Sequence, residues 1–215
     1  MTVAASAKHL ANDSAPGFRY YPAFLPPERA SAIATEVLTL IERAPFYRPQ
    51  MPRTGQPLRN RMTNLGSLGW ISDVKGYRYG PTHPETGEPW PEIPQAVRTI
   101  WDELADYPHP PEACLVNYYE GAEAKLGLHI DADELAVNAP VVSISLGDTA
   151  LFRLGGPERK NPTQSLRLSS GDVVVLGSAS RRFYHGVDRI YPGTSRLIPE
   201  GGRINLTLRR VTLPA

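Results

Sequence analysis

Two histidines and one aspartate are the side chains of this chain best suited to hold a metal ion together. His129 and Asp131 are separated by one residue, and His185 lies much further along the chain. Residues two apart in a β-strand point to the same side, so a strand would aim His129 and Asp131 at one ligand. Two imidazoles and one carboxylate occupy one face of an Fe(II) octahedron and leave positions open for an oxidising cosubstrate and O2. The spacing therefore predicts an Fe(II) site made of these three side chains.

The segments around these residues favour a metal site over a chance pattern. His129 ends the strand-like run 125–128, and His185 follows the apolar run 173–176. The chain has five histidines, and the other three lie in the N-terminal tail or in proline-rich stretches. An isolated His-x-Asp triplet arises by chance, and a single histidine is more often a structural residue. The prediction therefore depends on this context and on the small choice of ligands.

The chain length and the cysteine content limit the kinds of protein this can be. With 215 residues, of which 41% are hydrophobic, the chain suits one domain with a lid or extension. Cys114 is the one cysteine, which excludes an intramolecular disulfide and a cysteine-based zinc site, and its apolar surroundings predict burial. No apolar run approaches the ~20 residues that span a membrane, and the N-terminus lacks the apolar region of a secretory signal. We therefore expect a cytoplasmic protein that does not enter a membrane.

The charge distribution is more informative than the net charge of +1. Residues 44–70 contain four arginines, at positions 48, 53, 59 and 61, and no acidic residue. Such a segment can meet the phosphates of a nucleic acid. Composition alone favours a solvated arginine-rich loop, so both interpretations remain open at this point.

The N-terminal half predicts two helices separated by an irregular segment. Residues 1–16 are small and polar and are expected to be disordered, and residues 18–24 are typical of a short strand. Apolar residues at helical spacing predict helices over about 27–44 and 94–105. The stretch 45–92 lacks periodicity but is rich in Pro, Gly, Arg and aromatic residues, which favours a functional lid over disorder.

Eight short apolar runs follow Pro111 and are separated by turn residues. They cover residues 113–119, 125–129, 140–146, 150–154, 164–168, 172–176, 182–187 and 203–211. Eight short strands at regular spacing predict an all-β sandwich or barrel, for which the double-sheet jelly roll is the eight-strand solution.

The last of these strands carries a polar face made of Arg203, Asn205, Thr207 and Arg209. In an ordinary sandwich this face would contact solvent. In a roll that holds a polar ligand it would point inward, where two arginines can bind a dicarboxylate.

Taken together, these residues make the chain similar to the bacterial AlkB family of Fe(II)- and 2-oxoglutarate-dependent nucleic-acid dealkylases. The resemblance covers about residues 18 to 211. The matching segments are Leu68-Gly69-Trp70, Gly76-Tyr77-Arg78-Tyr79, Pro89-Trp90-Pro91, Asn117 with Tyr119, His129-Ile130-Asp131-Ala132-Asp133-Glu134, Gly155-Gly156, 171–175, Phe183-Tyr184-His185-Gly186 and the strand from Arg203 to Arg209.

The resemblance implies a mainly β fold with flanking helices, a double-stranded β-helix of the jelly-roll type with an N-terminal nucleotide-recognition lid. We expect one structural domain, with the extension and lid at 17–112 and the catalytic jelly roll at 113–215. The implied ligands of 2-oxoglutarate are Arg203 and Arg209, helped by Asn117, Tyr119 and Asn205.

The resemblance also implies which residues contact the substrate. Trp70 resembles the residue that stacks on a flipped base opposite His129, and Asp133 resembles the catalytic-site carboxylate that contacts an exocyclic amino group. The remaining implied substrate contacts come from the lid and a basic position further on: Tyr77, Arg78, Tyr79 and Lys160.

The implied reaction uses Fe(II), 2-oxoglutarate and O2 to hydroxylate an N-methyl group, with release of formaldehyde, succinate and CO2. The implied substrates are cationic lesions such as 1-methyladenine and 3-methylcytosine in single- or double-stranded DNA, with RNA as an alternative. A damaged base leaves the stack more easily, and an aromatic sandwich suits a cation. The protein is expected to act as a monomer.

Two other classes share parts of this pattern. A binding-only cupin would not need both Arg203 and Arg209, and a 2-oxoglutarate dioxygenase with a non-nucleic-acid substrate would not need Trp70 or the arginine-rich aromatic lid. The chain also departs from the family pattern. The loop before His129 is one residue longer, residues 48–60 align poorly, and Lys160 replaces an arginine, which leaves the substrate range open.

Overall fold

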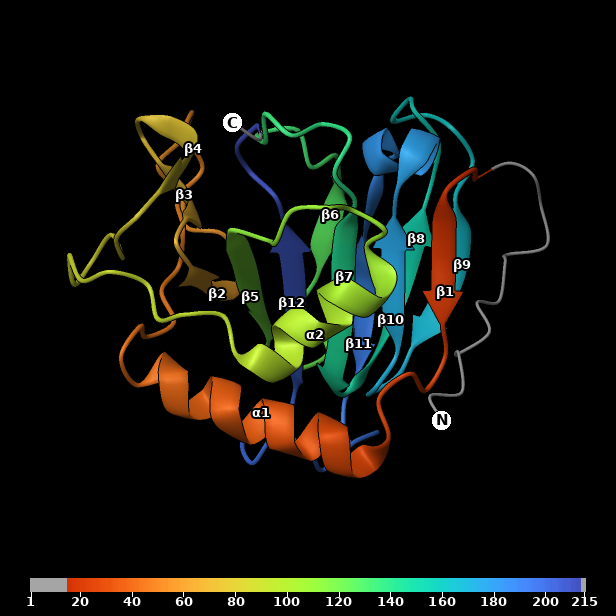
Figure 1. Ribbon diagram of the computed structural model, residues 1–215, viewed down its shortest axis with the longest axis horizontal. Coiled ribbons are helices and arrows are strands. Elements are labelled where there is room, and N and C mark those ends of the chain that lie inside the picture. The colour runs from red at the N-terminus through yellow and green to blue at the C-terminus, as the bar shows by residue number, and fades with distance from the viewer. Residues whose placement is uncertain (1–14, 214–215) are drawn as a thin grey trace.

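The computed structural model describes residues 15–213 (Figure 1). Nearly all of the tail expected to be disordered, residues 1–16, lies outside the described residues. In chain order the elements are β1 (Phe18–Tyr21), α1 (Pro27–Ile41), β2 (Arg61–Gly66), β3 (Gly69–Asp73), β4 (Gly76–Gly80), α2 (Gln95–Leu104), β5 (Ala113–Tyr119), β6 (Leu126–His129), β7 (Val141–Gly147), β8 (Thr149–Leu154), β9 (Gln164–Leu168), β10 (Val173–Leu176), the 3-10 helix Ser178–Arg182, β11 (His185–Tyr191) and β12 (Arg203–Arg209).

Two antiparallel sheets face each other and form the predicted jelly roll. The large sheet has six strands in the order β1-β10-β7-β12-β5-β2, and the small sheet has four in the order β6-β11-β8-β9. The eight strands expected after Pro111 are β5 to β12, and four of them lie in each sheet. The strands β1 and β2 of the N-terminal extension complete the large sheet at its two edges.

Both helices pack on the outer face of the large sheet (Figure 1). Their apolar stripes and the even-numbered residues of β12, such as Leu206, belong to one buried cluster. Burying each such side chain stabilises the fold by about 1.5–3 kcal/mol. Because residues alternate along a strand, this packing turns the odd-numbered polar residues of β12 into the space between the sheets. The inward alternative for the polar face is therefore confirmed.

The prediction that residues 45–92 lack regular structure is wrong in part. β2 lies within this stretch and pairs with β5 along its whole length, and β3 and β4 form a separate two-stranded hairpin. Four consecutive residues of β2 are buried, so the strand shows no alternation that a sequence pattern could reveal. Figure 1 shows the hairpin beyond the edge of the large sheet, on the side away from β1.

The hairpin is fixed to β2 through Trp70. The side chain of Asn64 accepts from the Trp70 N–H at 3.0 Å and donates to its carbonyl at 3.1 Å, as a neighbouring strand would. The hydroxyl of Tyr47 donates to the same carbonyl at 3.2 Å. The backbone at Trp70 is thus held from two sides.

None of the helices within residues 15–213 is long and apolar enough to cross a membrane.

The predicted strand 182–187 begins later than expected. Residues Ser178–Arg182 form a 3-10 helix, and β11 starts at His185 and continues to Tyr191. This change places His185 at the first position of its strand, beside the end of β6.

Candidate active site

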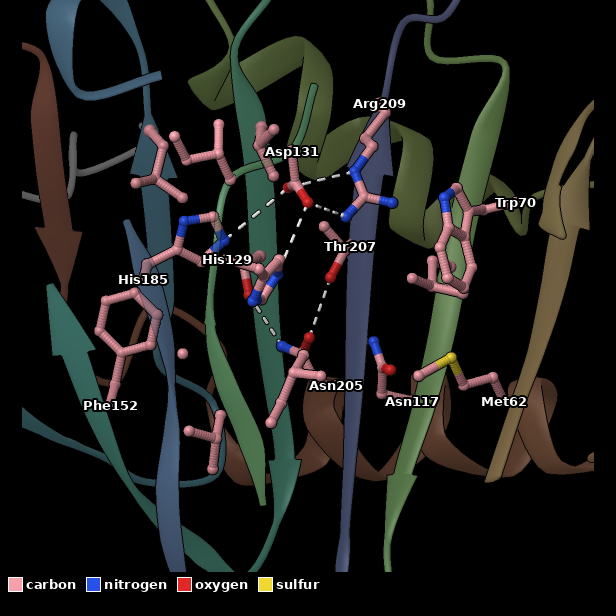
Figure 2. A pocket seen from close by; sticks show the side chains of 18 of the residues that line it. Met62, Trp70, Asn117, His129, Asp131, Phe152, His185, Asn205, Thr207 and Arg209 are labelled. Carbon is pink, nitrogen blue, oxygen red and sulfur yellow. Dashed lines mark hydrogen bonds and ion pairs between the residues drawn. The ribbon is translucent and has the colours of Figure 1, made fainter. Parts of the chain in front are cut away.

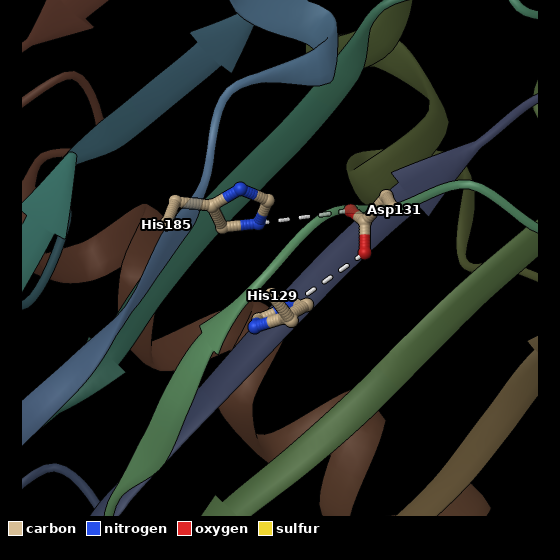
Figure 3. Close-up of side chains that lie close together, drawn as sticks. All are labelled: His129, Asp131 and His185. Carbon is tan, nitrogen blue, oxygen red and sulfur yellow. Dashed lines mark ion pairs between the residues drawn. The ribbon is translucent and has the colours of Figure 1, made fainter. Parts of the chain in front are cut away.

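The three predicted metal ligands meet where β6 and β11 lie side by side. His129 is the last residue of β6, and His185 is its register partner on β11. Asp131 follows two residues after His129, with one carboxylate oxygen 3.7 Å from His129 Nε2 and the other 3.8 Å from His185 Nε2. The three potential ligand atoms lie within 4.8 Å of one another (Figure 3).

Both histidines are oriented by the peptide backbone. His129 Nδ1 lies 2.9 Å from the carbonyl of Gly127, and His185 Nδ1 lies 3.0 Å from the carbonyl of Phe183. A carbonyl only accepts, so each Nδ1 carries a hydrogen, and each Nε2 is the ring nitrogen that faces Asp131. This is the tautomer that binds a metal through Nε2.

The charges of the three ligands also fit a divalent metal. Burial would raise the pKa of Asp131, but Arg209 and the two histidines hold that pKa well below its usual range. Burial and the neighbouring His129 lower the pKa of His185 to about 4. The site therefore combines a carboxylate anion with a neutral imidazole, which is the state that coordinates Fe(II).

A cavity of about 310 Å³ opens beside these residues between the two sheets. Its lining includes the metal ligands and all four polar residues of β12. Figure 2 shows Asn205, Thr207 and Arg209 on β12 beside His129 and Asp131, and Asn117 on the neighbouring strand. The predicted cosubstrate residues Asn117, Tyr119, Arg203, Asn205 and Arg209 all line this cavity.

Arg203 is a buried cation that forms no ion pair with any acidic residue in the described part of the chain. Its side chain donates to the carbonyls of Asp148 and Leu168, both at 3.2 Å, and to the hydroxyl of Ser145 at 2.7 Å. Its Nε has no partner, and burial lowers its pKa to about 10. A buried guanidinium in this state is suited to a carboxylate ligand, which would satisfy both its charge and its free N–H.

Arg209 differs from Arg203 because it already pairs with carboxylates. Its NH2 lies 2.8 Å from Asp131 Oδ1, and its Nε lies 3.4 Å from Glu134 Oε1. Asp131 and Glu134 balance Arg209 and Arg181, so this cluster of four buried groups is neutral as a whole. The cavity thus presents one paired and one unpaired guanidinium to a dicarboxylate.

The hairpin contributes two aromatic side chains to the lining of the cavity. The rings of Trp70 and Tyr77 stack with their centres 5.5 Å apart and their planes 19° from parallel. Trp70 Nε1 donates to Asp133 Oδ2 at 2.8 Å. These three predicted substrate residues line the same cavity as the metal ligands, together with Leu58 and Met62, which sequence reasoning missed.

The comparison of this chain with known proteins agrees with the Fe(II) site described above. The profile of the 2OG-Fe(II) oxygenase superfamily matches residues 17–209. An alpha-ketoglutarate-dependent dioxygenase AlkB homolog from Caulobacter vibrioides is 54% identical over 197 residues, which cover 91% of this chain and 88% of that protein. This chain belongs to the AlkB family. It is an Fe(II)- and 2-oxoglutarate-dependent dioxygenase.

Two further relatives extend the comparison. The alpha-ketoglutarate-dependent dioxygenase AlkB of Escherichia coli K12 is 40% identical to this AlkB-family enzyme over 185 residues, or 84% of each chain. The solved structure of OsALKBH1 is similar with a TM-score of 0.71 and 34% identity, over 91% of this chain and 98% of that one. The chain therefore spans most of the length of these relatives.

Three predicted substrate residues of this AlkB-family enzyme do not line the cavity. Arg78 forms an ion pair with Asp73 at 2.7 Å, and Lys160 lies 3.3 Å from Glu158 with 86% of its side chain exposed. The hydroxyl of Tyr79 turns inward and donates to a buried carboxylate. Contacts of these residues with a substrate stay predictions.

Two of the four arginines in the basic segment make contacts within the protein. Arg48 donates to the backbone carbonyls of Leu58 and Arg59. The guanidinium of Arg61 lies over the ring of Tyr118 at 4.9 Å and 3.3 Å from Glu120. These contacts favour a structural role for this pair.

Proposed function

We propose that this AlkB-family dioxygenase removes methyl groups from alkylated bases in nucleic acid, with 1-methyladenine and 3-methylcytosine in DNA as substrates. The observation that carries the proposal is the aromatic pair of Trp70 and Tyr77, which lines the same cavity as Asp133 and the three candidate Fe(II) ligands. A base that leaves the stack finds an aromatic surface there. A methylated base that is a cation also finds a carboxylate.

The reaction divides between the cofactor and the residues that hold it. When bound, Fe(II) together with 2-oxoglutarate and O2 supplies the oxidant that hydroxylates the N-methyl carbon, with release of succinate, CO2 and finally formaldehyde. His129, Asp131 and His185 would hold the iron. Arg203 and Arg209 would bind the two carboxylates of 2-oxoglutarate, and the walls of the cavity would exclude water from the reacting atoms.

The substrate residues would orient the base toward the metal. Trp70 would stack on one face of the base, opposite the ring of His129. Asp133 would provide the negative charge that favours a cationic lesion over a neutral one. We further propose that the enzyme acts as a monomer in the cytoplasm, and that RNA with the same lesions is a second substrate.

The test is mass spectrometry of oligonucleotides incubated with the protein, Fe(II), ascorbate and 2-oxoglutarate. Oligonucleotides with 1-methyladenine or 3-methylcytosine should lose the methyl group and yield one formaldehyde for each base restored. The His185→Ala variant and the unmethylated oligonucleotides are the controls. Consumption of 2-oxoglutarate with no change in any methylated DNA or RNA would overturn the proposal and indicate a dioxygenase with another class of substrate.

A further inference from the structure

Asp148 is a buried acidic residue that is neither a metal ligand nor one of the expected cosubstrate residues. It is 2% exposed and stands between Gly147, the last residue of β7, and Thr149, the first residue of β8. Because β7 belongs to the large sheet and β8 to the small sheet, Asp148 lies where the chain crosses from one sheet to the other.

The carboxylate of Asp148 holds the loop that connects β11 to β12. Its Oδ2 accepts from the backbone N–H groups of Gly193 and Gly202, both at 3.2 Å, and its Oδ1 accepts from the N–H of Ser195 at 3.0 Å. A carboxylate only accepts, so it suits a position that three N–H groups approach. One side chain therefore holds this loop at both of its ends.

The backbone of Asp148 contacts the start of β12. Its N–H donates to the carbonyl of Gly202 at 2.8 Å, and its carbonyl accepts from NH1 of Arg203 at 3.2 Å. Gly147 is the register partner of Arg203, and a Cβ at position 147 would lie 2.5 Å from the carbonyl oxygen of Gly202. The two segments approach this closely because Gly147 has no side chain. Asp148 thus holds Arg203 by its guanidinium and, through Gly202, by its backbone.

The orientation of the Arg203 guanidinium depends on a few contacts with neutral groups. NH1 is shared between the carbonyls of Asp148 and Leu168, and NH2 donates to the hydroxyl of Ser145. An arginine binds a carboxylate best through two parallel N–H groups, which requires a fixed orientation of its plane. Neutral acceptors hold a guanidinium less tightly than a carboxylate does, so a shift of the Asp148 carbonyl would turn Arg203 away from its ligand.

We propose that Asp148 is a positioning residue that acts through Arg203 on the binding of 2-oxoglutarate. Its carboxylate holds the β11–β12 loop, and this fixes the carbonyl that orients the guanidinium. Without the carboxylate, Arg203 stays charged and buried but loses its orientation, and small displacements of this kind weaken binding strongly. The inference rests on the assignment of Arg203 to the cosubstrate in the proposed function, and not on the nucleic-acid substrate.

The test is a double-mutant cycle, measured by calorimetric titration of 2-oxoglutarate into the Fe(II)-loaded protein without O2. Asp148→Asn keeps the size of the side chain but replaces one acceptor oxygen by an NH2 group that faces backbone N–H groups. Its Kd for 2-oxoglutarate should rise roughly tenfold, whereas in the Arg203→Met background the same change should alter the Kd less than about twofold. Equal rises in both backgrounds would overturn the proposal, because Asp148 would then act independently of Arg203.

Steady-state kinetics provide a second readout that a purely structural role would not move. The slow consumption of 2-oxoglutarate without nucleic acid is sufficient for this measurement. In Asp148→Asn the KM for 2-oxoglutarate should rise while kcat stays near that of the wild type, because the residues that would hold Fe(II) keep their contacts. An unchanged KM together with a lower melting temperature would contradict the positioning role.

Glu112→Gln is the matched control at the other end of β12. Glu112 Oε2 accepts from the backbone N–H groups of Val211 at 2.9 Å and Thr212 at 2.7 Å, so it is a second carboxylate that holds the chain next to this strand. The variant should lower the melting temperature without raising the Kd for 2-oxoglutarate. A rise as large as that of Asp148→Asn would overturn the proposal, since loosening either end of β12 would then have the same effect.

Thr194→Ala decides the question if Asp148→Asn does not fold. Thr194 is exposed, and its hydroxyl accepts from the N–H of Thr149 at 2.8 Å and lies 3.5 Å from Asp148 Oδ1. This milder variant loosens the same loop, so it should raise the Kd for 2-oxoglutarate by a smaller factor, and only where Arg203 is present. In that case an unchanged Kd for Thr194→Ala would overturn the proposal.

The Arg203→Met variant separates a failure of this inference from a failure of the proposed function. If Arg203→Met binds 2-oxoglutarate as the wild type does, the assignment of Arg203 to the cosubstrate fails, and this inference fails with it. If Arg203→Met binds weakly while Asp148→Asn binds normally, the assignment stands and this inference alone fails.

Discussion

Replacing Arg203 by methionine is expected to weaken 2-oxoglutarate binding on the order of 100-fold, while the free protein remains about as stable as before. Methionine keeps a long, flexible side chain in the buried position and removes only the charge and its N–H groups. The two effects differ because the guanidinium of Arg203 forms no ion pair with a carboxylate of residues 15–213. Its charge therefore lowers the stability of the free protein and raises the affinity for an anionic ligand.

The size of the effect follows from the burial of this charge. Burial lowers the pKa of Arg203 from its usual range above 12 to about 10, and one pKa unit is worth about 1.4 kcal/mol. Holding the charge thus costs the free protein on the order of 3 kcal/mol. The three hydrogen bonds that Arg203 donates to neutral acceptors stabilise the free protein by a similar amount. Arg203→Met removes both the charge and these hydrogen bonds, so the free energy of unfolding should change little. A carboxylate that pairs with Arg203 regains about 3 kcal/mol, or roughly a factor of 100 in affinity.

The assay is thermal unfolding of the Fe(II)-loaded protein without O2, at increasing 2-oxoglutarate, with calorimetric titration as a direct measure of Kd. The wild type should be stabilised as the ligand saturates it, by about 4 kcal/mol at 1,000 times Kd, and Arg203→Met should show almost no stabilisation at the same concentrations. Arg203→Lys is the control that keeps a charge without the fork of two N–H groups. Its Kd for 2-oxoglutarate should lie between those of the wild type and Arg203→Met. A Kd within threefold of the wild type, together with a large loss of stability, would refute the reasoning and make Arg203 a structural residue.

Further predictions concern the metal, the base pocket and the cysteine. His185→Ala should lose turnover and Fe(II) binding while its circular dichroism spectrum is unchanged, and activity at saturating iron would contradict its role as a ligand. Trp70→Ala should melt near the wild type and still consume 2-oxoglutarate slowly without substrate, but bind methylated oligonucleotides more weakly by about 1–3 kcal/mol; a large drop in melting temperature would indicate a core residue instead. Asp133→Asn keeps an acceptor for Trp70 Nε1 but loses the charge, so dealkylation of a cationic lesion should slow more than that of a neutral one, and equal losses would leave Asp133 an organiser of the site. Burial raises the pKa of the Cys114 thiol to about 12, so iodoacetamide should modify it only after denaturation, which intact-mass measurement would detect.

The jelly roll was predictable because its strands are short, apolar and separated by turn residues. The predicted bounds 113–119 and 164–168 agree with β5 and β9. The orientation of β12 was not predictable from its own residues, because alternation separates two faces without showing which one is inside. The helices that cover the even-numbered residues decide this, and their packing is a property of the whole fold.

The strands of the lid could not be predicted for a related reason. β2 depends on its pairing with β5, and Asn64 holds the start of β3 through the backbone groups of Trp70. Neither contact leaves a periodic pattern in the sequence. The candidate base residue Trp70 was identified from its type and the family resemblance, and the elements that carry it became visible only in the fold.

The same limit applies more strongly to the charged residues around the metal ligands. Chemistry restricts the ligands of Fe(II) to a few residue types, so His129, Asp131 and His185 can be identified by type and spacing. The surrounding positions need only complementary charges, and many residues meet that need. Arg181 and Arg182 are adjacent and identical in type, yet Arg181 is buried and Arg182 is exposed. The 3-10 turn before β11 places Arg181, and not Arg182, against the carboxylate of Glu134.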